Sequence, residues 1–202
     1  MIPTLPQLIS AVQGAWRLML WDREGLEKFD ITIEGFWRSF FAPLAALPAA
    51  ILVHVAYLAM VAETAATNPD AGLPDLPATG LYLAVKTATY TAEVILFPLL
   101  MILVARSAGL TERYVPFIIA WNWVNALIVG ILTIPHLLYL TGALGLVSIY
   151  GFQVIILGVS IICLYFTTWA SLRTPPMIAS IILGLSIALG LALEGIFRLI
   201  VL

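Results

Sequence analysis

Charged residues are scarce along this chain, and their scarcity decides its class. Only 10% of the 202 residues are Asp, Glu, Lys or Arg, whereas a soluble domain carries about 25%. Nine basic residues against eleven acidic ones leave a net charge of −2, so there is no basic excess to bind nucleic acid. Hydrophobic residues make up 62% of the chain, which indicates an integral membrane protein.

Cysteine and the motifs of catalysis are rare or missing. Cys163 is the only cysteine, which excludes a disulfide within one chain and a cysteine metal site. The sequence has no phosphate-binding Gly-Lys-Ser/Thr loop, no HExxH and no GxSxG. We therefore expect no enzyme activity, no catalytic residue and no metal site; a membrane enzyme stays a third alternative, because the absence of these motifs does not exclude one. The first ten residues, MIPTLPQLIS, also lack the features of a cleavable signal peptide, so the first apolar span is expected to direct insertion.

Five apolar runs of 20 or more residues follow a more polar start, and each is long enough to span a membrane as a helix. They cover residues 39–62, 82–105, 115–140, 143–170 and 177–202. The fold class predicted is all-α: a polytopic membrane protein with five transmembrane helices and an N-terminal interfacial amphipathic region. Only Thr141–Gly142 separates the third and fourth runs, which predicts a tight hairpin. Thr174 and Pro175 are predicted as N-cap and first residue of the fifth helix.

Residues 1–38 form the predicted cytoplasmic or interfacial segment, and residues 39–202 form the predicted transmembrane bundle. Within the first segment, apolar residues recur at helical spacing, which indicates an amphipathic helix (Leu5, Leu8, Ile9, Val12, Trp16, Met19 and Leu20). Trp16, Arg17, Trp21 and Trp37 suit a membrane interface. Packing of this helix on the protein's own cytoplasmic face is the alternative interpretation.

Basic residues alternate with loops that lack them, and this alternation predicts the orientation. Four basic residues precede the first span, whereas the loop at 63–80 has none. Arg106 and Arg113 lie in the next loop, and Arg173 precedes the fifth span. By the positive-inside rule we expect a cytoplasmic N-terminus and a periplasmic C-terminus, in a bacterial inner membrane.

Glu93 lies near the middle of the second span and is the leading candidate for chemistry. An ionisable group at this depth is costly and normally faces protein or water, which favours a proton- or cation-carrying carboxylate. A hydrogen-bonded acid that only fixes packing is the alternative. Lys86 lies two turns earlier on nearly the same face, but we expect it to extend toward the outer interface instead of pairing with Glu93.

Amide side chains in the neighbouring spans extend this candidate site. Asn122 and Asn125 are three residues apart in the third span and share a helix face. They are expected either to line a polar cavity with Glu93 or to pack against another helix. Gln153, in the fourth span, is expected to extend the same polar lining. His54 and His136 fall at different depths, about 12 and 6 Å from the outer boundary by helical rise, which argues against a haem ligated by both; no cofactor is expected.

The layout of the chain resembles that of the Yip-domain family of five-span bacterial membrane proteins. The features that match are the segment WRLMLWDREGLEKF, the following FWRSFFAPLAALP and the five closely spaced spans. This resemblance is one of layout and supplies no catalytic residue. It implies a helical membrane scaffold with protein or lipid partners. The sequence hypothesis is therefore a non-enzymatic scaffold or accessory subunit of a membrane assembly. The alternative is a small transporter or channel that uses Glu93 for proton or cation coupling. The partners expected are the lipid bilayer and either another protein or further copies of this chain.

Overall fold

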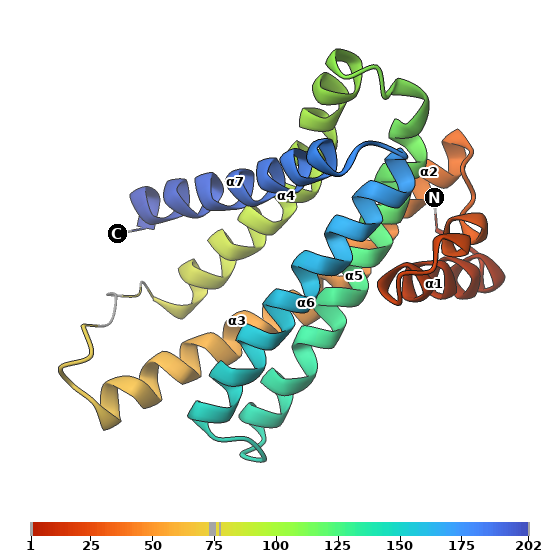
Figure 1. The fold of residues 1–202 in the computed structure, drawn as a ribbon. Coiled ribbons are helices and arrows are strands. Elements are labelled where there is room, and N and C mark those ends of the chain that lie inside the picture. The colour runs from red at the N-terminus through yellow and green to blue at the C-terminus, as the bar shows by residue number, and fades with distance from the viewer. Residues whose placement is uncertain (1, 73–75, 77, 202) are drawn as a thin grey trace.

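The computed structural model describes residues 2–72, 76 and 78–201, and over these residues the chain is helical and contains no strand. Five of its helices are long and apolar enough to cross a membrane, which confirms the predicted fold class. The elements are α1 Leu5–Met19, the 3₁₀ helix η1 Arg23–Lys28, α2 Ile33–Ser39, α3 Phe41–Thr67, α4 Thr79–Ser107, α5 Thr111–Leu140, α6 Leu146–Leu172 and α7 Pro176–Val201 (Figure 1).

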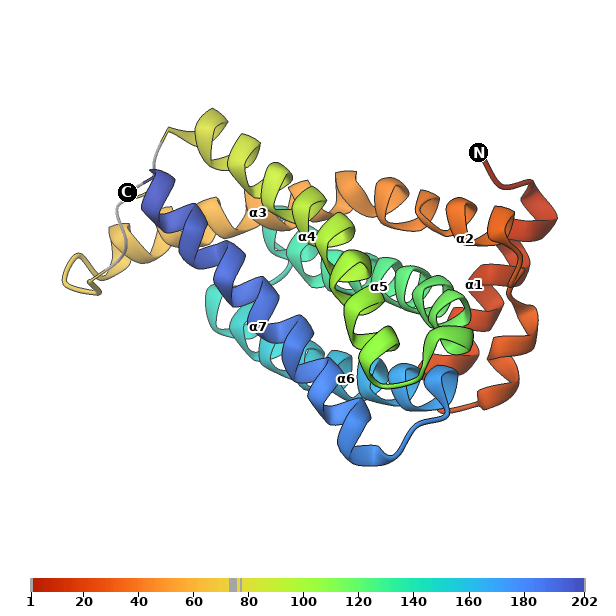
Figure 2. The same ribbon diagram turned by 90° about the horizontal axis from the view of Figure 1, so that it is seen from above.

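Helix α5 is the centre of the bundle. It packs on α3 and α6 along much of its length and also contacts α1, α2 and α4. Helices α4 and α7 pack on each other, and α7 diverges from α6 after the short connection between them (Figures 1 and 2). The two groups, α3–α5–α6 and α4–α7, are therefore close at one end of the molecule and splayed at the other.

Buried side chains form three clusters that hold this arrangement together. One joins α1 to α5 and α6 through Leu18, Trp123 and Phe166. Another joins α4, α5 and α7 around Phe97, Phe117 and Ile182, and the third lies near the α5–α6 hairpin. The hairpin is formed as predicted, and Gly142 adopts φ 76° in its turn, a conformation that glycine reaches at little cost.

The helix boundaries differ from the predicted spans where side chains form capping or interhelical contacts. Helix α3 continues to Thr67, so Glu63 is helical and not part of the outer loop. Its carboxylate accepts a hydrogen bond from the Tyr139 hydroxyl at 2.6 Å, which fixes this last turn against α5. The predicted cap of the fifth helix was wrong by one residue, because α7 begins at Pro176 and the Pro175 carbonyl accepts from its first turn.

Two glycines let α1 and η1 cross at backbone contact. A Cβ built on Gly25 would stand 2.5 Å from the Gly14 carbonyl oxygen, and one on Gly14 would stand 2.7 Å from the Gly25 carbonyl oxygen. Real Cβ atoms do not approach that closely, so a side chain at either position must push the two elements apart. The crossing positions η1 beside the end of α6.

We expect Gly25→Ala to lower the free energy of unfolding of the N-terminal unit by about 1–3 kcal/mol, the usual cost of overpacking. Gly130→Ala in α5 is the matched control, because a Cβ there meets no atom within 4 Å. Proteolysis rates at residues 20–30 would measure the effect. Equal proteolysis rates in Gly25→Ala and Gly130→Ala would show that the contact between α1 and η1 accommodates a side chain at Gly25 without a loss of stability.

Asp30 fixes the start of α2. Its carboxylate accepts from the hydroxyl and the backbone N–H of Thr32, at 2.6 and 3.2 Å, and from the Arg38 guanidinium at 2.8 Å. These contacts, led by the Thr32 hydroxyl, lower the pKa of Asp30 below its ordinary value. The helix-capping oxygen itself comes from Thr32, which accepts from the Gly35 N–H.

Because the pKa of Asp30 is lower in the folded than in the unfolded protein, Asp30 contributes fully to the stability of α2 at pH values above the ordinary aspartate pKa of about 3.9. This contribution is lost as the pH falls through the pKa of Asp30 in the folded protein. We expect amide protection of residues 33–39 to decline below about pH 4. The decline should be modest because the side chain is 38% exposed. Hydrogen exchange corrected for intrinsic rates measures it. Asp30→Asn should lack this step, and an identical step in that variant would assign it to another group.

Candidate functional site

Glu93, the middle residue of α4, lines a cavity of about 220 Å³ between α3, α4 and α5. The structure brings Glu93 together with Asn122 and Asn125 on this cavity. The remaining lining is largely apolar or aromatic (Pro43, Tyr90, Val94, Phe97, Pro98, Trp121 and Val129). A second cavity of about 220 Å³ shares Pro43, Tyr90 and Val94, and its other lining residues come from α4 and from the start of α3 and the residue before it (Phe40, Leu44, Leu47 and Thr91).

The hydrogen bonds of the two asparagines determine which of their atoms remain available. Asn122 donates from Nδ2 to the Ser39 hydroxyl at 3.0 Å, and that hydroxyl donates to the Phe36 carbonyl at 2.7 Å. Asn125 donates from Nδ2 to the Trp121 carbonyl at 3.0 Å. Because each amide nitrogen already has an acceptor, the amide oxygens are left as acceptors, and no donor among the described residues bonds to either.

Proline adds a further acceptor to the same cavity. Pro98 has no N–H, so the Val94 carbonyl, one turn earlier in α4, does not receive the usual helical hydrogen bond. Both residues line the cavity. The cavity is thus bordered by a carboxylate, two amide oxygens and a backbone carbonyl. Such a set of oxygens suits a proton or a small hard cation and does not suit an anion.

Glu93 itself has no ion-pair or hydrogen-bond partner among the described residues. Its side chain is exposed at the protein surface of the bundle, and Oε1 lies 3.6 Å from where a Cβ on Gly190 of α7 would stand. A Cβ at Gly190 would therefore make only an ordinary van der Waals contact with the carboxylate, which places Glu93 against α7. Glu93 therefore lies where α4, α5 and α7 meet.

Lys86 pairs with a residue that the sequence interpretation did not connect to it. Its ammonium lies 2.5 Å from the Glu194 carboxylate of α7, and its side chain is only 11% exposed. It also lies 4.2 Å from the centre of the Phe197 ring, a cation–π distance. The structure thus pairs Lys86 with α7 and not with Glu93, and its extension toward the outer interface stays a prediction.

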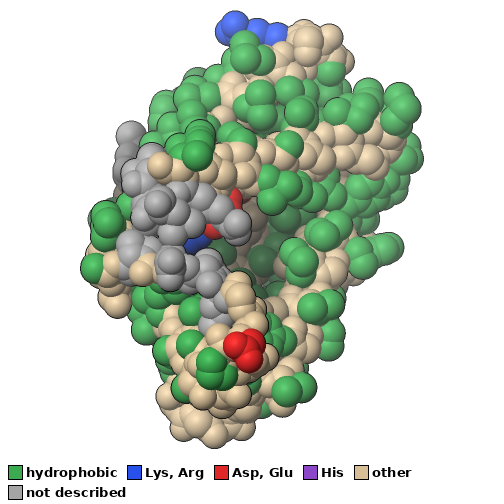
Figure 3. Space-filling model, turned by 90° about the vertical axis from the view of Figure 1, so that its left-hand side faces the viewer, with side chains coloured by type: hydrophobic (Ala, Val, Ile, Leu, Met, Phe, Trp, Pro, Cys, Tyr) green, Lys and Arg blue, Asp and Glu red, His purple; other side chains and the backbone are tan. Residues whose placement is uncertain are grey.

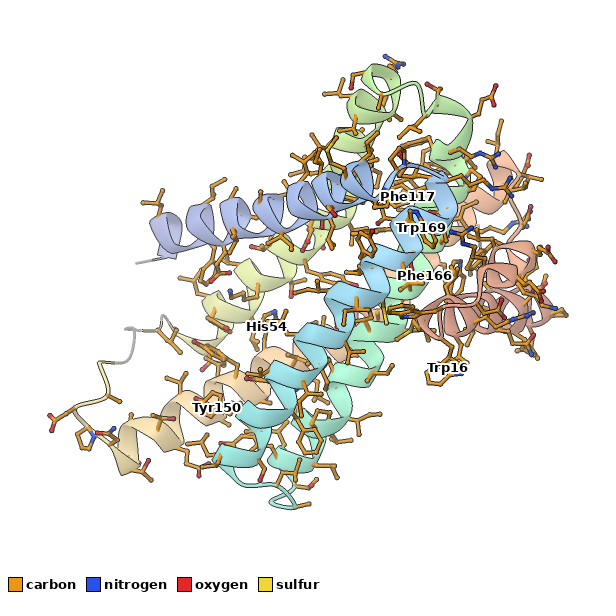
Figure 4. All side chains as sticks on the ribbon, viewed as in Figure 1. Trp16, His54, Phe117, Tyr150, Phe166 and Trp169 are labelled. Carbon is orange, nitrogen blue, oxygen red and sulfur yellow. The ribbon has the colours of Figure 1, made fainter. Side chains whose placement is uncertain are left out.

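This ion pair lies at the splayed end of the bundle, two turns of α4 beyond Glu93. Tyr82 packs beside it, edge-on to His54 of α3 at 6.0 Å and stacked on Tyr57 at 6.2 Å. Figure 4 shows His54 on the part of α3 that faces this space. Figure 3 looks onto the same end and shows a central hollow, bordered mainly by hydrophobic side chains, with acidic and basic atoms at its edge.

The function of this site has to be inferred from its own chemistry. Comparisons of the chain with known protein families, with curated proteins and with solved structures found no match. No group of three or more His, Cys, Asp or Glu side chains that would suit a metal ion occurs within the described part of the chain. Glu93, Asn122 and Asn125, which line one cavity within the membrane-spanning helices, are therefore taken as the candidate site.

Gln153 does not join this constellation. Its Nε2 lies 3.0 Å from Nε2 of His136, and the His136 Nδ1 donates to the Leu132 carbonyl at 2.7 Å. Because the carbonyl must accept, His136 carries its proton on Nδ1 and accepts from Gln153 through Nε2. This pair links α5 and α6 near the hairpin, so the prediction that Gln153 extends the Glu93 lining was wrong.

The N-terminal tryptophans lie on the outside of the protein. Trp16, Trp21 and Trp37 are about half to two-thirds exposed, and Arg17 bonds Asp22 at 2.5 Å and Glu24 at 2.6 Å. Helix α1 packs on the bundle through Ala11, Ala15 and Leu18. Most of the bulky apolar stripe predicted for it faces outward instead (Leu5, Ile9, Val12, Trp16 and Leu20). Figure 4 shows Trp16 pointing away from the bundle.

Proposed function

We propose that this chain is a small membrane transporter or channel that binds a proton or small cation at Glu93. The observation that supports the proposal is a carboxylate without a protein partner among the described residues, set at mid-helix on a cavity with two free amide oxygens. Ionisable residues within transmembrane helices are rare and characteristically mark ion and proton pathways. We assign the splayed end, with the Lys86–Glu194 pair, to the periplasmic side of a bacterial inner membrane.

The packing around the cavity favours access of an ion to Glu93 from the splayed end of the bundle. Beyond Glu93, toward the other end of α4, Phe97 stacks on Trp121 at 4.4 Å and meets Phe117 at 6.1 Å. These rings belong to a well-buried cluster. At the opposite end the helices diverge around the hollow of Figure 3. In this conformation a cation or proton reaches Glu93 from the splayed end, and passage requires the aromatic cluster to move.

A scaffold or accessory-subunit role is the second candidate. It is supported by the bulky stripe of α1, which is directed away from the bundle, and it is the role that the resemblance of the sequence layout to Yip-domain proteins implies. Under this proposal the lipid bilayer and a protein partner cover α1 and the outer helix faces. Glu93 would then fix packing at a helix contact.

One experiment separates the two proposals. The tagged protein is extracted gently, its mass is determined, and the purified protein is reconstituted in vesicles for proton and sodium flux. A homo-oligomer or monomer without companions that conducts either ion supports the transporter. A companion protein in fixed ratio, with no flux above that of protein-free vesicles, overturns it in favour of the accessory subunit.

A further inference from the structure

A cavity of about 490 Å³ lies outside the Glu93 site, between η1, the end of α6 and the segment that leads into α7. Its polar lining consists of Arg23, Glu24, Glu27, Arg173 and Thr174, and Trp169 forms an apolar wall. The stacking of Trp21 on Phe166 at 5.7 Å holds η1 against α6. Figure 4 shows Phe166 and Trp169 on the part of α6 that lies beside the N-terminal elements.

Thr174 carries an unsatisfied buried hydroxyl in this cavity. The residue is 5% exposed, and its Oγ1 has no hydrogen-bond partner. Buried hydroxyls in folded proteins are normally bonded, so an orphan at a cavity wall indicates a missing ligand. Thr174 also lies two residues before Pro176, the first residue of α7, and the dipole of a helix favours a negative charge near its N-terminus.

Two guanidinium groups give the cavity its charge. Arg23 lies over the Trp169 ring at 3.7 Å, and neither Arg23 nor Arg173 has a carboxylate partner among the described residues. Glu24 is already bonded to Arg17 at 2.6 Å. Arg173 ends α6 with φ 49° and ψ 44°, a left-handed conformation uncommon for a residue with a side chain. Within the part of the chain that the structure describes, the cavity therefore has two cations without an ion pair, Arg23 and Arg173, and one such carboxylate, Glu27.

We propose that this cavity binds a phosphate ester, with Arg23 and Arg173 on the phosphate oxygens and the Thr174 hydroxyl donating to one of them. Arginine is well suited to this role because its planar fork matches two phosphate oxygens. Glu27 faces an ammonium group when the ligand carries one, as phosphoethanolamine does. The exposed Trp16 and Trp21 near this end suit the headgroup region, so a phospholipid headgroup and a soluble phosphate ester share the required chemistry.

The test uses the full-length protein, delipidated in detergent, and native mass spectrometry with added phosphatidylethanolamine. Thr174→Val keeps the shape of the side chain and removes the orphan hydroxyl, so folding should be retained while lipid binding weakens about tenfold, the scale of one hydrogen bond to an anion. Arg173→Gln should weaken binding at least as much. Arg106→Gln removes an exposed charge in the last turn of α4, outside the cavity, and should leave binding unchanged.

Competition identifies the source of the phosphate. Displacement of the lipid only by other phospholipids assigns the site to a headgroup, whereas displacement by free phosphoethanolamine or glycerol 3-phosphate assigns it to a soluble ester. Either result, with the two cavity variants weakened, supports the proposal. The proposal would be overturned if Thr174→Val and Arg173→Gln bound the lipid and both esters as tightly as wild type does. It would also be overturned if folded wild-type protein bound neither the lipid nor either ester.

Discussion

Glu93→Gln is expected to reduce proton or cation flux in reconstituted vesicles to the background of protein-free vesicles. Glutamine keeps the size and hydrogen-bonding shape of the side chain but neither exchanges a proton near neutral pH nor provides a negative charge. No ion pair is lost in this change, because Glu93 has none within the described residues. The free energy of unfolding should therefore shift by less than about 1 kcal/mol.

The matched control for Glu93→Gln is Glu112→Gln. Glu112 lies in the first turn of α5, is exposed, and does not line the cavity. Its flux should equal that of wild type, which separates the effect of one position from a general loss of acidic charge. Flux in Glu93→Gln equal to wild type would remove Glu93 from the transport proposal and leave it a packing residue.

Glu194→Gln should destabilise the contact between α4 and α7 by about 3 kcal/mol, the lower end of the cost of breaking a buried ion pair. The lower end is appropriate because the Glu194 side chain is 35% exposed, although that of Lys86 is 11% exposed. The change leaves the Lys86 ammonium within the bundle without the carboxylate at 2.5 Å. Unfolding by denaturant in detergent micelles measures the loss.

A double variant tests whether the cost comes from the stranded charge. Lys86→Met combined with Glu194→Gln should recover most of the lost stability, because removing both partners of a buried pair is often close to neutral. Glu24→Gln, which breaks the exposed pair with Arg17, should cost less than about 1 kcal/mol. A loss for Glu194→Gln no larger than this control would show that the Lys86–Glu194 pair is fully solvated.

The sequence alone determined the five spans, because a bilayer requires long uninterrupted apolar helices whatever their neighbours are. It also located the α5–α6 hairpin at Gly142, whose turn conformation depends on a local preference of glycine. The shared face of Asn122 and Asn125 follows from helical periodicity within one span. Local rules of this kind act over a few residues and can be read directly from the chain.

Tertiary structure alone decided which polar groups meet. Lys86 and Glu194 are 108 positions apart, and Gln153 bonds His136 instead of joining Glu93; both results depend on how helices rotate and pair. Helix α1 crosses η1 at backbone contact because Gly14 and Gly25 have no side chains, which the periodicity of bulky residues does not reveal. Interhelical contacts depend on packing, rotation and tilt, and no single span encodes those quantities by itself.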